Sequence, residues 1–221
     1  MFIGIAAGRA AENESRIKRL RREKIKEVAK ALFHAQGIRE TTMQQIADQA
    51  GTGRRTIYHY YETKEEIAVD IQQEYLACLQ AVEGLDAIMA QAVTGIRRVE
   101  ALLDRLLDHY LHHADKIQYL HEFDRIFRQA DGYAFTTTRL EDYPVYQCLK
   151  IAIEQGQADG TIRPMAEPEL GKTILTICHA LIALIDRITV RPDVLKRIYD
   201  YDEADVRLFV RLCTQGLRHS G

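Results

Sequence analysis

Apolar side chains recur every three or four residues along almost the whole chain, and this period limits the fold more than any other feature. Such a spacing places the apolar side chains on one face of a helix. Only 4 prolines and 13 glycines interrupt the 221 residues, which are few for a loop-rich all-β protein. No β pattern interrupts the helical segments. The sequence therefore predicts an all-α protein.

Composition and cysteine usage narrow the class of protein further. With 47% apolar and 28% charged residues, the chain has the composition of a globular protein, which excludes disordered, collagen-like and disulfide-rich classes. Its four cysteines form no CxxC and indicate thiols of a reducing compartment. No apolar run reaches the roughly 18 residues of a membrane span. Met1–Gly8 lacks the leading positive charge of a signal peptide. We expect a cytoplasmic protein without a membrane segment, in which residues 1–12 are disordered.

Charge is distributed unevenly along the chain. Residues 1–64 carry 13 Lys and Arg against 7 Asp and Glu, a net charge of +6, whereas residues 65–221 have a net charge of −8. A basic end on an acidic body suggests that this end touches a polyanion. The densest basic run, Arg16–Lys24, is either a solvated helix face or an extension that lies along phosphates.

Two short helices separated by a glycine turn follow the first long helix. The long helix, expected from Asn13 to Gln36, ends at Gly37. Thr42–Gln45 fits a capping box that opens a helix of about two turns, and Gly51-Thr52-Gly53 separates it from a second short helix that begins at Arg54. This arrangement predicts a helix-turn-helix within residues 13–64, whose second helix would enter the DNA major groove. The alternative is an ordinary helical hairpin.

The stretch Ile25–Ile67 resembles the DNA-binding domain of TetR-type (TetR/AcrR-like) transcriptional regulators. The resemblance is carried by Ile25, Ala29, Leu32, Phe33, Gly37, Thr42, Ile46, Ala47, Ala50, Gly51, Thr56, Ile57, Tyr58, Tyr61, Lys64 and Glu65. Two positions depart from the family pattern. Thr52-Gly53 replaces the usual Val-Ser, which removes the customary Ser cap, and Arg55 stands where a small residue is common.

The resemblance implies roles for individual residues. Thr42, Tyr58 and Lys64 would contact phosphates, whereas Arg54, Arg55 and Thr56 would reach base edges from the start of the recognition helix. An arginine there would bind guanine O6 and N7. His59 and Tyr60 would contact backbone or bases. The expected DNA-binding residues are Thr42, Gly53, Arg54, Arg55, Thr56, Tyr58, His59, Tyr60 and Lys64.

Residues 65–221 read as amphipathic helices, expected at 65–83, 85–92, 94–113, 115–131, 143–157, 167–190 and 203–218. The resemblance implies that this body binds a small-molecule effector and forms a homodimer through the last two long helices. Aromatic and polar side chains of the middle helices would suit an apolar or amphipathic ligand. The expected ligand-binding residues are His109, His113, Tyr119, Phe123, Phe127, Tyr133, Phe135, Tyr143, Tyr146, Cys178 and His179.

Enzyme and metal functions find less support in the sequence. It contains no GxSxG elbow, phosphate loop or dinucleotide fingerprint. His109 and His113 have the i,i+4 spacing of a zinc-binding pair, with His112 and His121 nearby, but the chain lacks HExxH and a solvated polar face is equally natural. We expect no cofactor, no metal and no catalytic residue.

The chain is predicted to be a repressor that a small molecule releases from a palindromic operator in double-stranded DNA. Its alternatives are a DNA-binding protein whose body serves only for dimerisation or protein interaction, and a metal-dependent helical-bundle enzyme.

Overall fold

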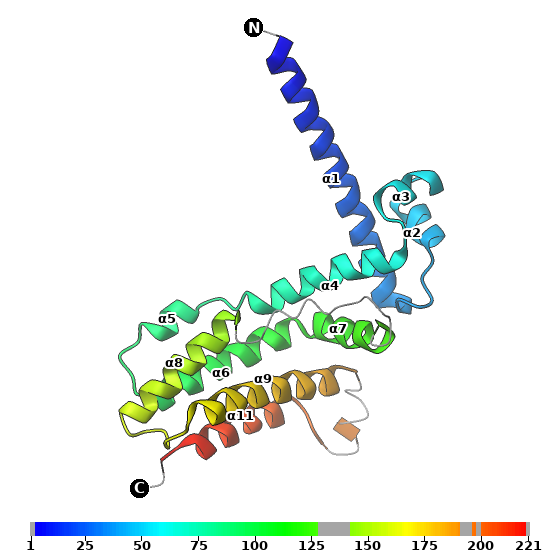
Figure 1. Ribbon diagram of the computed structural model, residues 1–221. Helices are drawn as coiled ribbons and strands as arrows, with labels where there is room; N and C mark the ends of the chain where they lie inside the picture. Colours follow the sequence, from blue (N-terminus) through cyan, green and yellow to red (C-terminus); the bar gives the residue numbers. More distant parts are fainter. Residues whose placement is uncertain (1–2, 128–141, 191–195, 198–199, 220–221) are drawn as a thin grey trace. The chain divides into compact units, whose positions relative to one another are not determined.

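The computed structural model describes residues 3–127, 142–190, 196–197 and 200–219, and its named elements are all helices (Figure 1). One isolated antiparallel bridge joins Ile162 and Arg218. The expected all-α fold is thus confirmed. The helices are α1 (Ile3–Gln36), α2 (Met43–Ala50), α3 (Arg54–Tyr60), α4 (Lys64–Gln80), α5 (Leu85–Met89), α6 (Gly95–His112), α7 (Ala114–Phe127), α8 (Pro144–Ala158), α9 (Glu167–Val190) and α11 (Glu203–Leu217).

The chain forms two compact units whose boundaries differ from the single division expected after residue 64. The first, here called the N-terminal unit, comprises Met1–Glu74 and His121–Gln129; the second, the body, comprises Tyr75–Leu120 and Ala130–Gly221. Helix α4 therefore begins in one unit and ends in the other. The second half of α7 belongs to the N-terminal unit, where Glu122 contacts Ile38, a residue distant in sequence. No local sequence signal reveals such a partnership.

Helix α1 begins ten residues before the expected start. It extends back to Ile3, so residues 3–12 are helical, whereas the sequence predicted disorder for 1–12. Four alanines in residues 6–11 explain the continuation in physical terms, because alanine has the highest intrinsic helix propensity. No proline interrupts the segment.

The N-terminal unit packs its helices around fully buried side chains. Phe33 of α1, Ile46 of α2 and Ile57 of α3 are at most 1% exposed. The small buried residues Ala47 and Ala50 leave room for α3 beside α2. Gly51 ends α2 in the left-handed region, at φ 65°, which glycine adopts without steric cost. The two short helices and their turn lie where the sequence predicted them.

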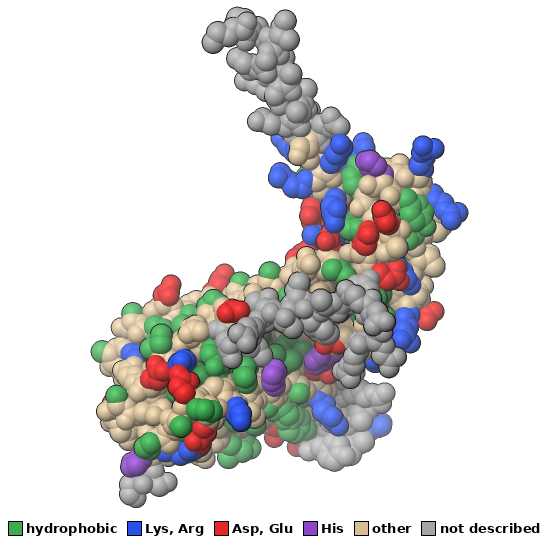
Figure 2. Space-filling view, in the orientation of Figure 1, with side chains coloured by type: hydrophobic (Ala, Val, Ile, Leu, Met, Phe, Trp, Pro, Cys, Tyr) green, Lys and Arg blue, Asp and Glu red, His purple; other side chains and the backbone are tan. Residues whose placement is uncertain are grey.

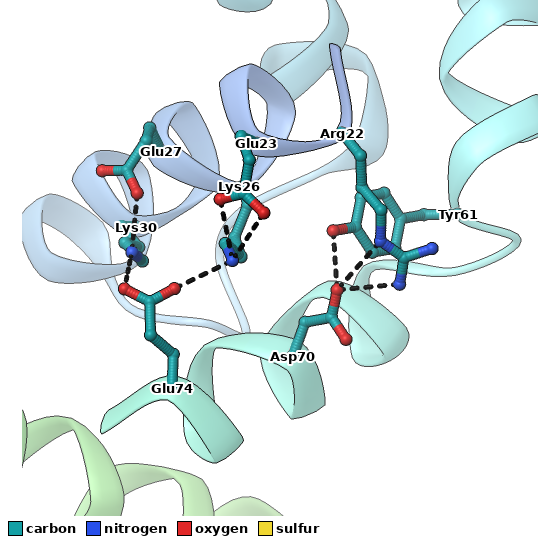
Figure 3. A network of polar contacts seen from close by, with 8 residues as sticks. All are labelled: Arg22, Glu23, Lys26, Glu27, Lys30, Tyr61, Asp70 and Glu74. Carbon is teal, nitrogen blue, oxygen red and sulfur yellow. Dashed lines mark hydrogen bonds and ion pairs between the residues drawn. The ribbon is translucent and has the colours of Figure 1, made fainter. Parts of the chain in front are cut away.

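A polar network joins α1 to the first turns of α4 (Figure 3). Arg22 forms an ion pair with Asp70 (Nη2 to Oδ2, 2.8 Å), and the hydroxyl of Tyr61 donates to the same carboxylate oxygen at 2.8 Å. Burial, followed by the hydrogen bond to Asp70, raises the pKa of Tyr61. Glu74 accepts from both Lys26 and Lys30. These contacts orient α4 against α1.

The body is a bundle in which α6 carries the central apolar face. Leu102, Leu103, Leu106 and Leu107 of α6 are completely buried. The start of α6 lies against the end of α8 so closely that a Cβ on Gly95 would stand 2.1 Å from the backbone nitrogen of Gly156. The turn after α8 leads into α9 at Glu167, as the sequence predicted.

Helix α9 qualifies as a possible membrane span by length and composition, contrary to the expectation from uninterrupted apolar runs. The stretch Glu167–Thr189 has a mean hydropathy of 1.4 in an 18-residue window. A core helix of a soluble bundle passes the same test. Leu170, Ile174, Leu181 and Ile185 of α9 are at most 2% exposed, so the apolar composition of this helix is explained by packing.

Candidate nucleic-acid interface

Helix α3 presents a polar face opposite one buried anchor. Ile57 is completely buried, whereas Arg54, Arg55, Tyr58 and His59 are exposed. Neither arginine has a hydrogen-bond or ion-pair partner within the described ranges. A helix anchored on one side, with unpaired guanidinium groups on the other, is suited to reach base edges in a major groove.

The remaining α3 residues support the helix and its start. Gly53 is the N-cap, in extended backbone and without a side-chain cap bond, as the missing serine predicted. Thr56 and Tyr60 are half-buried. The rings of His59 and Tyr60 meet edge to face, with centroids 5.4 Å apart.

Thr42 forms the capping box that the sequence predicted for α2. Its hydroxyl oxygen accepts from Gln45 N at 3.2 Å, and its own backbone N–H donates to the Gln45 side chain at 2.8 Å. The hydroxyl also donates to Gln45 Oε1 at 3.0 Å. Because these groups of Thr42 are already engaged, a phosphate at this helix end would meet the next backbone amides of the first turn, which have no partner inside the helix.

Lys64 has a structural role that the sequence did not reveal. Its ammonium group donates to three backbone carbonyls in the connection between α1 and α2: Ile38 O at 2.9 Å, Arg39 O at 2.8 Å and Thr41 O at 2.7 Å. An ammonium has three protons, so none is left for a phosphate in this conformation. The expected phosphate contact by Lys64 would require the exchange of one of these bonds.

A basic cleft lies beside α3. It has a volume of about 340 Å³, and its wall includes Arg21 and Lys24 of α1, the Gly51–Gly53 turn, and Thr56 and Tyr60 of α3. Lys and Arg side chains are prominent on this part of the visible surface (Figure 2). Arg21 and Lys24 have no ion-pair partner in the described part of the chain. Two unpaired cations at a cleft beside α3 extend the positive surface beyond the recognition helix.

Glu122 is a residue of this unit that sequence reasoning missed. Its Oε1 accepts from the backbone N–H of Ile38 at 3.1 Å. It also lies where a side chain on Gly37 would collide, 3.0 Å from an added Cβ, and Gly37 has a φ of 86°. The turn after α1 is thus fixed by a carboxylate from α7, more than eighty residues away.

The expected ligand-binding residues do not form one group in the structure. His109 and His113 line a cavity of about 490 Å³ in the body. Desolvation lowers the pKa of both imidazoles, and nearby Lys116 lowers that of His113 further. Phe123 and Phe127 belong instead to the N-terminal unit, where their rings lie 4.5 Å apart.

The other expected ligand-binding residues are dispersed through the body. Tyr119 packs edge to face on Tyr75, with centroids 5.1 Å apart. Tyr143 and Cys178 lie near the buried phenol of Tyr110, whose pKa is raised chiefly by desolvation; sequence reasoning did not select Tyr110. Tyr146 is buried on α8, whereas His179 is exposed on α9. Tyr133 and Phe135 lie outside the described residues.

The histidines do not form a group of three close metal ligands within the described ranges. The one such group found there is Glu23, Glu27 and Glu74. Lys26 and Lys30 neutralise these carboxylates through ion pairs. Ion pairing on a helix surface accounts for this acidic cluster.

Comparison with known proteins agrees with the geometry. The family described as "Bacterial regulatory proteins, tetR family" matches residues 25–71. The HTH-type transcriptional repressor KstR2 of Mycobacterium tuberculosis is 30% identical over 153 residues, which is 68% of this chain and 73% of that protein. KstR2 of Mycolicibacterium smegmatis is 24% identical over 151 residues, 68% of this chain and 71% of that protein.

A solved structure shows the same fold. The ketosteroid transcriptional regulator KstR2 of Mycobacterium tuberculosis superposes with a TM-score of 0.52 at 18% identity, over 90% of this chain and 96% of that one. The exposed recognition helix, the family match in its own region and the similarity to KstR2 point to one conclusion. This chain belongs to the tetR family of bacterial transcriptional regulators, which are DNA-binding proteins and not enzymes.

Proposed function

We propose that this protein is a homodimeric repressor that binds a palindromic operator and leaves it when a small molecule binds to the body. The observation that carries the DNA-binding part is the exposed face of α3, where Arg54 and Arg55 have no partner in the described residues. The relatives named as repressors support the sign of regulation. Such a protein would act in the cytoplasm, together with the chromosome.

Exposed apolar side chains support dimerisation through α9 and α11. Leu208 and Leu212, one turn apart on α11, are 44% and 55% exposed. His179 and Ala183 are exposed on α9, which packs beside α11 (Figure 1). Two protomers that bury these faces would present two recognition helices. A dimer of helix-turn-helix units binds half-sites about one helical turn apart, so the operator is expected to be a palindrome.

The effector would enter the cavity lined by His109 and His113. Its wall combines imidazole, thiol and charged groups, which suits a ligand with polar groups. An effector releases DNA only if it binds the DNA-incompetent state more tightly. Helix α4 would connect the two processes, because its first residue is Lys64 and Cys78 in its last turn lines the cavity.

The function is tested by selecting random double-stranded DNA on the purified protein at two salt concentrations. Enrichment of a palindrome is expected, and Tyr58→Ala should lose it because the exposed phenol would contact the phosphates that fix the register. If the protein retains DNA only weakly, without sequence preference and only at low salt, then α3 is a charge patch and the proposal is wrong.

Two variants, Arg55→Ala and Lys24→Ala, should distinguish base recognition from phosphate binding. Arg55→Ala is expected to relax preference at one base pair in each half-site, at a cost of about 1–3 kcal/mol in discrimination. Lys24→Ala should weaken binding to all sequences and reduce the salt slope by about one. Titrations of operator variants at several salt concentrations measure both effects. Equal weakening of every operator by Arg55→Ala would contradict its assignment to a base.

A further inference from the structure

The thiol of Cys78 lies at the wall of the body cavity, in the last turns of α4. The cavity also receives Ala81, Glu83, Arg105, Asp108, His109, His112 and His113. Cys78 is half-buried and lines this cavity. Its backbone carbonyl is held by the Nε2 of His109 at 3.1 Å, which fixes the turn that carries the thiol.

A chain of three groups leads from Lys116 to this sulfur. Lys116 Nζ lies 3.2 Å from Nδ1 of His113, and His113 Nε2 lies 3.6 Å from Cys78 Sγ. A protonated lysine can only donate, so Nδ1 of His113 must accept. The imidazole proton of neutral His113 then sits on Nε2 and points to the sulfur. An N–H donor backed by a cation can hydrogen-bond to the sulfur and to the negative charge that this sulfur carries when it reacts.

The tautomer of His113 also bears on whether Cys78 acts as a metal ligand or as a nucleophile. A metal ion on Cys78 and His113 would need the lone pair of Nε2, and the proton would then have to move to Nδ1. There it would face the ammonium group of Lys116, 3.2 Å away. The arrangement therefore disfavours metal binding by this pair and leaves the sulfur as the reactive atom.

Among the residues that the structure describes, the other three cysteines have no such histidine contact. Burial raises the pKa of Cys148 and Cys213, and it raises the pKa of Cys178 to about 12. A raised pKa lowers the thiolate fraction at neutral pH and with it the reactivity. The same molecule thus contains three internal controls for Cys78.

We propose that Cys78 is a covalent sensor site that takes an α,β-unsaturated carbonyl compound as its ligand. Its thiolate forms a C–S bond at the β-carbon, the carbon–carbon π bond breaks, and the electron pair moves to the carbonyl oxygen as an enolate. Water then protonates the α-carbon, which balances the proton that the thiol released to solvent. The addition needs no oxidant or reductant.

Arg105 supplies a binding partner for the carbonyl group. It lines the same cavity, and its guanidinium has no hydrogen-bond or ion-pair partner among the residues that the structure describes. Asp108, the nearby carboxylate on α6, is paired with Arg207 at 2.7 Å. A cation that lines the same cavity as the sulfur favours a ligand whose oxygen gains negative charge during the reaction.

An adduct at Cys78 would act on α4, and this step rests on the proposed function. The same helix begins with Lys64, which holds the connection between α1 and α2. A bulky group on the last turns of α4 would shift the population toward a state with lower DNA affinity, provided that the adduct fits that state better.

The first test treats the full chain, in the absence of DNA, with a limiting amount of N-ethylmaleimide, which is an α,β-unsaturated carbonyl compound. Peptide mass spectrometry follows each cysteine. Cys78 should be labelled about tenfold faster than Cys148 or Cys213, which are also half-buried. Lys116→Met should slow the labelling of Cys78 alone, and Lys116→Arg should restore it, because arginine also donates to Nδ1. Equal rates at Cys78 and Cys213 in the unaltered protein would overturn the proposal.

The second test asks whether the adduct controls DNA binding. Protein labelled at Cys78 should bind its selected DNA at least about tenfold more weakly, a coupling of ordinary size, whereas maleimide should not change the DNA affinity of Cys78→Ser. Cys213→Ser serves as the matched control and should respond like the unaltered protein. Labelled protein that binds DNA unchanged would overturn the sensor role. Unlabelled protein that fails to select DNA would instead refute the proposed function and leave the thiol chemistry standing.

Discussion

Replacing both Leu208 and Leu212 by glutamate is expected to convert the proposed dimer to a monomer and to reduce operator affinity about 1,000-fold or more. Both side chains are largely exposed on α11. Burial of a leucine at an interface stabilises it by roughly 1.5–3 kcal/mol, and four leucines would be buried in a symmetric pair. Glutamates there would be desolvated without partners. Sedimentation and DNA titration measure the two effects.

A matched control is available on another helix of the body. Ile151 of α8 is 50% exposed, so Ile151→Glu makes the same type of change outside the proposed interface. It should leave both the dimer and operator binding intact. A double variant in α11 that still sediments as a dimer would place the interface elsewhere. If Ile151→Glu also gave a monomer, then exposed apolar surface in general, rather than the α9 and α11 face, would drive association.

Local signals predicted the helix-turn-helix well. The capping box of Thr42 and Gln45 was readable because both its hydrogen bonds join residues three apart. Gly51 ends α2 in the left-handed region, a conformation that glycine adopts because it has no Cβ, so its own identity predicted the helix end. The face of α3 followed from periodicity, since burial of Ile57 determines where Arg54 and Arg55 point.

Contacts between distant segments were beyond the same reasoning. The bond from Ile38 N to Glu122 joins residues 84 positions apart, and no period or cap marks Glu122 as a partner. For the same reason the sequence assigned Phe123 and Phe127 to the body, although they belong to the N-terminal unit. Cys78 was not selected, because the walls of its cavity come from α4, the segment after it and α6, which are distant in sequence.

Replacing Lys64 by methionine is expected to lower the free energy of unfolding by about 2 kcal/mol, because it removes three hydrogen bonds from a charged donor. The acceptors are Ile38 O, Arg39 O and Thr41 O. Lys64 is half-buried, so water can hydrogen-bond to some of the three carbonyls in the variant. The decrease in the free energy of unfolding is therefore smaller than the sum of three hydrogen bonds from a charged donor. Methionine preserves the apolar stem. Chemical denaturation measures the change.

The same variant distinguishes a structural lysine from a phosphate contact. Lys24→Met removes the same charge from an exposed position and should change the stability by less than about 0.5 kcal/mol, while lowering the salt slope of DNA binding. If Lys64 held a phosphate, Lys64→Met would behave like Lys24→Met, with a normal midpoint of unfolding and a salt slope lower by about one. The three hydrogen bonds to carbonyls predict that Lys64→Met destabilises the protein and leaves the salt slope of DNA binding, measured at low temperature, unchanged.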